Sequence, residues 1–271
     1  MTTTRAVVLA RGLGTRMRAE DPSVALTEEQ RRAAEAGLKA MIPVNGRPFL
    51  DYLLSALADA GIRDVGLVVG PEHEEVRRYY TSVAPPARVA LGVVVQPEPL
   101  GTAHAILSAE KWTGGDPFLA VNADNLYPVQ ALRTLASLDE PGLPAFDRDD
   151  LVRTGNIPEE RILAFALIDV DAGGYLRRIV EKPDSDRPAS AGSPPFISMN
   201  CWRFDARIFG ACRDVPRSAR GEYEIPEAVA LALRRGVRFR TFPATGPVLD
   251  LSRRADAVDV ARRLAGVIPR P

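Results

Sequence analysis

Residues 5–17 read Arg5-Ala-Val-Val-Leu-Ala-Arg-Gly-Leu-Gly-Thr-Arg-Met17, an apolar run that passes directly into a glycine-rich turn. The continuous run Arg5–Leu9 is typical of a strand covered on both faces, as in a parallel sheet. The turn can bring backbone N–H groups up to an anion, and Arg16 adds a permanent charge, so the stretch favours a phosphate site. The alternative is a turn that ends the strand for geometric reasons alone.

Further apolar runs alternate with amphipathic patterns along the first half of the chain. Strands are expected at residues 65–69, 89–95 and 117–121. Helices are expected at residues 49–60, 72–80 and 102–109. This alternation favours βαβ units. We therefore expect an α/β, Rossmann-like fold in a single domain over residues 1–271, with a mostly parallel central sheet, helices on both faces and no C-terminal β-helix domain.

The second half continues in the same style. Strands are expected at residues 162–170, 176–180, 196–204 and 237–242. Helices are expected at residues 205–212, 225–235 and 255–265, and a loop at 184–195. An insertion before Gly37 contains Thr27-Glu-Glu-Gln30, which predicts a capping box and a short helix through Ala36. That helix is either a lid over a site or a plain surface helix.

The composition is that of a globular protein with no charge excess: Lys+Arg and Asp+Glu both total 35 in 271 residues. This balance argues against a nucleic-acid partner and favours small anions. Cys201 and Cys212 lack zinc-site spacing, so we expect free thiols in a reducing compartment. No apolar run approaches the roughly 18 residues of a membrane helix, and the start does not resemble a signal peptide. We expect a cytoplasmic protein without a membrane partner; homo-oligomerisation is left open.

A second motif, Lys39-Ala-Met-Ile-Pro-Val-Asn-Gly-Arg-Pro48, stands just before the helix expected at 49–60. The order G-x-G-T-R, then K-x-x-x-P-x-x-G-R-P, resembles the sugar-1-phosphate nucleotidylyltransferase family. Further segments resemble that family's motifs in the family's order: Gln96–Ala105, Asn122–Asn125, Val180–Pro183, Met199–Cys201, Gly221–Ile225 and Val248–Leu251. Each motif is weak evidence by itself, and the resemblance lies in their order from Arg5 to about Leu264.

The resemblance implies a nucleotide-binding half at about residues 1–125 and a sugar-phosphate-binding half at about 126–271. It implies that the nucleotide contacts Leu9, Ala10, Gly12, Gly14, Thr15, Gln96, Gly101 and Thr102, with Gln96 and Gly101 at the base. The implied sugar-phosphate residues are Asn122, Glu181, Lys182 and Asn200. The implied Mg²⁺ ligands are Asp124 and Asp250, and the implied catalytic residues are Arg16, Lys39 and Lys182.

Simpler explanations exist for several of these residues. Asp124 follows a strand and Asp250 precedes a helix expected near residue 253, so both could be caps without a metal. Glu181 and Lys182 could form an exposed charged pair before a proline. His104 is expected to be non-catalytic, because its motif position belongs to base binding.

The activity implied by the resemblance is transfer of a nucleoside monophosphate from a nucleoside triphosphate to a sugar 1-phosphate or a sugar-like polyol phosphate. UTP or dTTP is favoured, because the Gln96 amide can pair with uracil or thymine, although adenine can pair with an amide as well. The alternative is a catalytically silent regulatory subunit. A dehydrogenase is disfavoured, because Met17 replaces the third glycine of G-x-G-x-x-G.

Three features depart from the family pattern. Arg11 stands where the family usually has Gly or Ala, the segment between Arg16 and Lys39 is longer than usual, and Cys201-Trp202 replaces small residues. Arg11 could crowd the base, point outward or add a phosphate contact. These departures leave the acceptor and the role of Arg11 open.

Overall fold

The computed structural model describes residues 2–12, 14–19, 26–162, 164–180 and 196–271. The predictions for Glu181, Lys182 and the 184–195 loop therefore lie outside the described residues.

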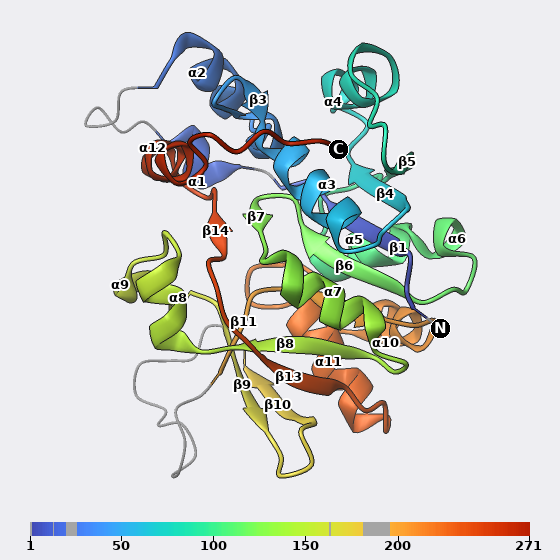
Figure 1. Ribbon diagram of the computed structural model, residues 1–271. Helices are drawn as coiled ribbons and strands as arrows, with labels where there is room; N and C mark the ends of the chain where they lie inside the picture. The colour runs from blue at the N-terminus through green and yellow to red at the C-terminus, as the bar shows by residue number, and fades with distance from the viewer. Residues whose placement is uncertain (1, 13, 20–25, 163, 181–195) are drawn as a thin grey trace.

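A mixed ten-stranded sheet runs through both halves of the chain (Figure 1). The first half contributes four parallel neighbours: β5 (Ala90–Val95), β4 (Asp64–Val69), β1 (Arg5–Leu9) and β6 (Phe118–Asn122). The path continues through antiparallel neighbours: β12 (Trp202–Phe204), β8 (Gly142–Phe146), β11 (Phe196–Ser198), β9 (Ala166–Val170) and β10 (Leu176–Val180). The remaining strand, β13 (Arg240–Ala244), lies parallel to β8. The expected α/β fold with a parallel core is confirmed, and the second half adds antiparallel strands.

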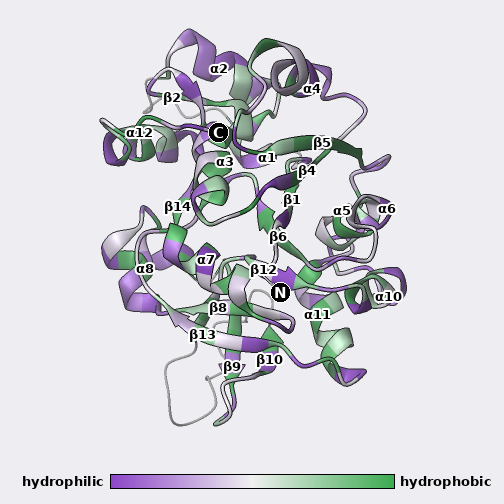
Figure 2. Ribbon diagram, turned by 45° about the vertical axis from the view of Figure 1, so that its right-hand side comes forward, coloured by the Kyte–Doolittle hydropathy of each residue, from purple (hydrophilic) through white to green (hydrophobic). Residues whose placement is uncertain are grey.

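Helices cover both faces of the sheet. The central strand β1 illustrates this, because its alternate side chains pack against helices on opposite sides. Ala6 and Val8 pack in one buried cluster with α3 (Phe49–Asp59) and α7 (Val129–Ser137). Val7 packs in the other cluster, and the helices of that face are α5 (Thr102–Ser108), α10 (Arg207–Asp214) and α11 (Ile225–Arg234). A strand apolar on both sides is what two buried faces require. Figure 2 shows hydrophobic residues along the central strands and hydrophilic ones along much of α2 and α8.

A third apolar cluster packs beneath the insertion. It joins α1 (Thr15–Arg18), α2 (Glu28–Glu35) and α12 (Arg254–Arg263), to which Met17, Ala34 and Val260 respectively belong. The predicted capping box is confirmed. The backbone N–H of Gln30 donates to Thr27 Oγ1 at 3.2 Å, and the backbone N–H of Thr27 donates to Gln30 Oε1 at 3.1 Å. These contacts fix where the helix begins.

Smaller elements complete the chain. The helices among them are the 3₁₀ turn Lys39–Met41, α4 (Glu74–Arg78) with a π-helical turn Tyr79–Val83, α6 (Glu110–Thr113), α8 (Arg148–Thr154) and α9 (Glu159–Ile162). Two short ribbons pair β2 (Pro43–Val44) with β3 (Arg47–Pro48), and β7 (Asn125–Leu126) with β14 (Leu249–Asp250).

Two strands differ in their bounds from those expected from the sequence. Ile162 is the last residue of α9, so the strand expected from residue 162 begins only at Ala166. The strand expected at 196–204 is two strands, because Asn200 has a φ of 51° and breaks the extended backbone. Trp202 and Phe204 stack in the core with ring centroids 5.6 Å apart.

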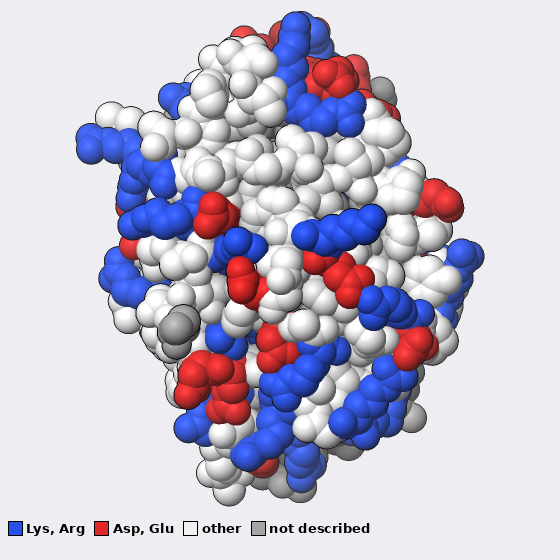
Figure 3. All heavy atoms as spheres, turned by 90° about the vertical axis from the view of Figure 1, so that its right-hand side faces the viewer, with Lys and Arg blue, Asp and Glu red and all other residues white. Residues whose placement is uncertain are grey.

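The surface and the helices add two negative observations. On the face in Figure 3, basic and acidic side chains are interspersed and form no continuous basic stripe. Within the described ranges, no helix is long and apolar enough to span a membrane.

Candidate active site

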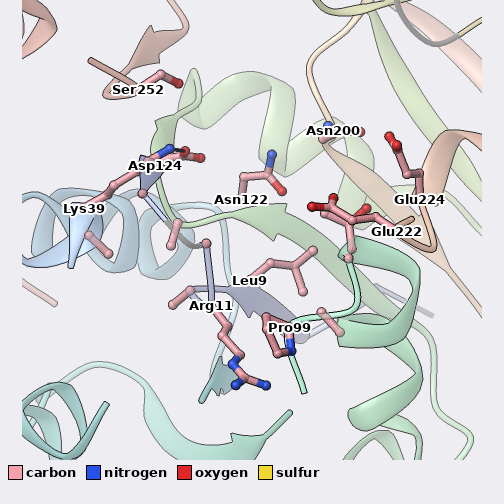
Figure 4. Close-up of a pocket in the computed structure, with 18 of the residues that line it drawn as sticks. Leu9, Arg11, Lys39, Pro99, Asn122, Asp124, Asn200, Glu222, Glu224 and Ser252 are labelled. Carbon is pink, nitrogen blue, oxygen red and sulfur yellow. Dashed lines mark hydrogen bonds and ion pairs between the residues drawn. The ribbon is translucent and has the colours of Figure 1, made fainter. Parts of the chain in front are cut away.

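A cavity of about 410 Å³ opens where the carboxyl ends of β1 and β6 lie side by side (Figure 4). In open parallel sheets this edge is the usual place for ligands. Many of the residues singled out from the sequence line it: Leu9, Ala10, Gly12, Gly14, Arg16, Lys39, Gln96, Gly101, Thr102, Asn122, Asp124 and Asn200. Segments far apart in the sequence thus contribute to one cavity.

The β1–α1 turn has the shape that its glycines permit. Gly14 has a φ of +62°, and a Cβ there would lie 3.0 Å from both the Cα and the carbonyl oxygen of Gly37. A larger residue would therefore push the insertion away from the turn. The Gly14 carbonyl accepts bonds from the N–H groups of Met17 and Arg18 at 2.9 and 2.8 Å, which starts α1. Arg16 is exposed on this short helix and lines the cavity.

Lys39 and Asp124 meet at the wall of the cavity. Their charged atoms lie 3.1 Å apart, and their side chains are 18% and 25% exposed. Asp124 lies in the turn after β6, where its carbonyl accepts the Leu251 N–H at 2.8 Å. The structure thus pairs a proposed phosphate-binding cation with a proposed metal ligand.

Asp250 lies on β14, close enough to Asp124 for their charges to interact, but it is not among the residues that line the cavity. It pairs across the β7–β14 ribbon with Asn125, whose side-chain amide donates to it at 3.1 Å. Ser252 Oγ donates to the same oxygen at 2.8 Å, and Arg161 forms an ion pair with the other. Burial, and next the negative charge of Asp124, raise the pKa of the Asp250 carboxyl to about 6.

The capping explanation for Asp250 is wrong, because α12 begins at Arg254 with Arg253 before it. Asp256 instead accepts the exposed N–H groups of Ser252 and Arg253. No group of three or more His, Cys, Asp or Glu is placed to hold a metal in the described part of the chain. A pair of neighbouring carboxylates still suits Mg²⁺, which commonly binds one or two carboxylates together with substrate phosphates and water. The donor set at Asp124 and Asp250 therefore fits that ion.

The other end of the cavity is built around Gln96, which follows β5. Its Nε2 donates to the Gly101 carbonyl at 3.1 Å and lies 3.0 Å from His104 Nδ1. Gly101 has a φ of +101°, and a Cβ there would lie 2.5 Å from the Tyr223 carbonyl oxygen. Only glycine fits this close approach of two backbones.

That close approach joins two motifs that are far apart in the sequence. The Tyr223 N–H donates to the Leu100 carbonyl, and the Tyr223 carbonyl accepts the Ala103 N–H, both at 2.8 Å. Thr102 Oγ1 accepts the Ile225 N–H at 3.0 Å, so this hydroxyl holds the start of α11. The segment expected at the base therefore also positions the Gly221–Ile225 motif.

Asn122 and Asn200 both line the cavity, and Asn200 lies on the side of Glu222 and Glu224 (Figure 4). The Asn200 Oδ1 atom is buried and accepts no hydrogen bond from the described residues. Tyr127 holds this segment, because its hydroxyl donates to the Met199 carbonyl at 2.9 Å. An unpaired buried acceptor is costly, and this one belongs to a residue that lines the cavity.

Comparison with known proteins decides the family. The model of the family described as nucleotidyl transferase matches residues 5–250. The chain belongs to the nucleotidyl transferase family. Its resemblance to sugar-1-phosphate nucleotidylyltransferases, inferred from eight ordered motifs, is confirmed.

Among curated nucleotidyl transferases, a glucose-1-phosphate thymidylyltransferase of Streptomyces antibioticus is 31% identical over 95% of this chain and 65% of its own length. The chain thus spans about two thirds of that relative. A UTP–glucose-1-phosphate uridylyltransferase, AglF, of Haloferax volcanii is 29% identical over 96% of both chains. In structure, a UTP-bound UGPase from Acinetobacter baumannii superposes with a TM-score of 0.75 at 19% identity, covering 98% of this chain and 95% of its own, which supports the shared fold.

Several cavity residues were not identified from the family motifs. Glu222 and Glu224 line the cavity from the Gly221–Ile225 motif, whose resemblance signalled the segment but not the individual residues. Outside the cavity lining, Arg161 is paired with both Asp250 and Asp256, and no sequence signal marks it. Thr15 begins α1 between Gly14 and Arg16, which both line the cavity.

Proposed function

We propose that this protein transfers a nucleoside monophosphate from UTP or dTTP to a sugar 1-phosphate and releases pyrophosphate. Glucose 1-phosphate is the first acceptor to test, because the relatives are named for it. One observation carries the proposal: a single cavity is lined by Arg16 and Lys39, by Asp124, and by the Gln96–Gly101 pair at its other end. This cavity offers separate places for phosphates, an ion and a base.

The chemistry asks for charge neutralisation rather than a general base. A phosphate monoester has a second pKa near 6, so the attacking sugar phosphate is largely a dianion at neutral pH. One of its oxygens attacks the α-phosphorus, the bond from that phosphorus to the bridging oxygen breaks, and pyrophosphate leaves with the electron pair. Positioning and fixed positive charge supply most of the rate in such reactions.

The cations of the chain are assigned by position. Arg16 and Lys39 neutralise the pyrophosphate; Arg16 comes from α1, Lys39 comes from the 3₁₀ turn Lys39–Met41, and both line the cavity. An ion pair between Lys39 Nζ and Asp124 Oδ2, 3.1 Å apart, positions the ammonium group. Lys182 is proposed to hold the attacking phosphate and Glu181 the sugar, by motif alone, because both lie outside the described residues.

Asp124 and Asp250 would hold Mg²⁺, which supplies charge neutralisation at the reacting phosphates when bound. Gln96 and Gly101 read the base, while the turn from Leu9 to Thr15 and Thr102 surround the nucleotide. Asn122 and Asn200 orient the sugar, where the unpaired Asn200 Oδ1 can accept from a hydroxyl.

The test is a pyrophosphate-release assay that pairs each of five nucleoside triphosphates with a panel of sugar and polyol phosphates. We expect Mg²⁺-dependent release that is fastest with UTP or dTTP. Tight nucleotide binding without release for any pair would overturn the proposal and would indicate a regulatory, binding-only relative.

A further inference from the structure

Arg11 lines the cavity from the β1–α1 turn, and its side chain extends away from Lys39 and Asp124, with Pro99 beside it (Figure 4). Only 6% of its side chain is exposed. Its Nε and Nη2 donate to the two carboxylate oxygens of Glu72 at 3.1 and 3.2 Å, and Nη1 donates to the Gln96 carbonyl. Arg11 therefore neither points outward nor lies free. It is fixed beside Gln96.

These contacts leave part of the guanidinium available. Arginine carries five N–H groups, and three of them have acceptors among the described residues. One N–H on each Nη has no acceptor among the described residues. The two hydrogen bonds to the Glu72 carboxylate fix the plane of the Arg11 guanidinium, as bidentate pairs do. Gly70 makes room for this arrangement, since a Cβ there would lie 2.3 Å from Glu72 Oε1.

The neighbouring amide of Gln96 cannot offer a donor to the base. Its Nε2 faces the Gly101 carbonyl, which can only accept, so the orientation of the amide follows from that bond. The second Nε2 hydrogen lies toward His104 Nδ1 at 3.0 Å. What remains for a ligand is Gln96 Oε1, an acceptor.

The polar groups left at the base end are thus one acceptor and several donors. Gln96 Oε1 accepts, Arg11 donates, and the Gly101 N–H has no partner among the described residues. Uracil and thymine carry the complementary edge, a ring N–H between two carbonyl oxygens. Adenine and cytosine place a ring nitrogen acceptor where that N–H is needed, and guanine offers only one carbonyl. A site that leaves buried polar groups unpaired rejects the wrong ligand strongly.

We propose that Arg11 is a specificity-determining residue that supplies the donor Gln96 cannot, and thereby selects the imide edge of uracil or thymine. Glu72 is its positioning residue. This inference rests on the proposed function, since it assumes that the cavity binds a nucleoside triphosphate. It assigns the choice of base to a residue in the phosphate-binding turn rather than to the glutamine alone.

The test measures dissociation constants for UTP, dTTP, ATP, CTP and GTP by calorimetry, on the full chain with Mg²⁺ and without an acceptor. In the unchanged protein we expect UTP and dTTP to bind most tightly. Arg11→Met should weaken UTP and dTTP about tenfold to a hundredfold, as for loss of a good base contact. The constants for ATP and CTP should change by less than about threefold.

Two further variants separate recognition from folding. Arg77→Met makes the same change on α4, where Arg77 pairs with Glu74 outside the cavity, and should leave all five constants unchanged. Glu72→Gln keeps Arg11 but weakens the two hydrogen bonds that fix its guanidinium. This variant should reduce the preference for UTP, as Arg11→Met does, by a smaller factor. It remains informative if Arg11→Met fails to fold.

The inference is overturned if Arg11→Met weakens all five nucleotides equally, which indicates a phosphate or structural role, or if it changes none. It is also overturned if the unchanged protein binds ATP or CTP as tightly as UTP. Because these are binding constants, they decide the role of Arg11 separately from pyrophosphate release. Selective UTP binding without turnover would support Arg11 while refuting the proposed transfer.

Discussion

Replacing Lys39 by Met should cost activity far more than stability. The Lys39–Asp124 ion pair is partly exposed, at 18% and 25% of the two side chains, and such pairs contribute up to about 1 kcal/mol to folding. The same ammonium is proposed to neutralise the leaving pyrophosphate. Removing one preorganised charge-stabilising group typically lowers kcat by about 10²- to 10³-fold, equivalent to about 3–4 kcal/mol.

The assay is pyrophosphate release under saturating Mg²⁺, with thermal unfolding measured on the same samples. Lys39→Arg keeps the charge and should retain more activity than Lys39→Met. Lys111→Met is the matched control, because Lys111 is exposed on α6 and does not line the cavity. The reasoning would be refuted if Lys39→Met kept near-normal kcat, or if its activity loss were matched by Lys111→Met.

Four further outcomes follow from individual contacts. Gly101→Ala should lower the free energy of unfolding by more than about 1 kcal/mol and raise the KM for UTP, because the added Cβ would lie 2.5 Å from the Tyr223 carbonyl oxygen. Denaturation and steady-state kinetics measure the two effects, and an unchanged KM would contradict the prediction. Thr27→Ala should destabilise the protein by about 1 kcal/mol with kcat unchanged, since it removes only the α2 capping box; a large loss of kcat would instead favour the lid. The folded-state pKa of Asp250, about 6, exceeds the unfolded value, so ionisation of this carboxyl lowers native stability as pH rises from about 4 to 6. Denaturation at about pH 4 and 7 should show that Asp250→Asn lacks this loss, and parallel pH profiles of the two proteins would rule it out. Removing divalent ions with EDTA should abolish release without unfolding the chain, and activity that survives EDTA would argue against a metal at Asp124.

The parallel half of the fold could be predicted because its signals are local. The run Ala6-Val-Val8 serves two buried faces at once, so its apolar character is continuous. The α2 capping box depends on two side chains three residues apart and was found for the same reason. The site was predictable as a set of motifs, since the order of those motifs is itself visible in the sequence.

Other features depend on contacts across the chain and could not be predicted. The break at Asn200 reflects a left-handed backbone conformation. Asparagine tolerates this conformation, but its neighbours Met199 and Cys201 are not turn residues and do not predict a break there. The ion pair of Arg161 with Asp250 joins residues 89 positions apart. The direction of Arg11 was open for the same reason, because Glu72 and the Gln96 carbonyl that hold it come from two other loops.

The central claim is that Asp124, Asp250, Arg16 and Lys39 form one site where two anions meet. A crystal structure with Mg²⁺ and a non-hydrolysable UTP analogue tests it most directly. We predict a metal about 2.0–2.1 Å from oxygens of Asp124, Asp250 and the α-phosphate, with Lys39 turned from Asp124 to the phosphates. A nucleotide bound outside this cavity, or a metal that neither carboxylate touches, would contradict the account.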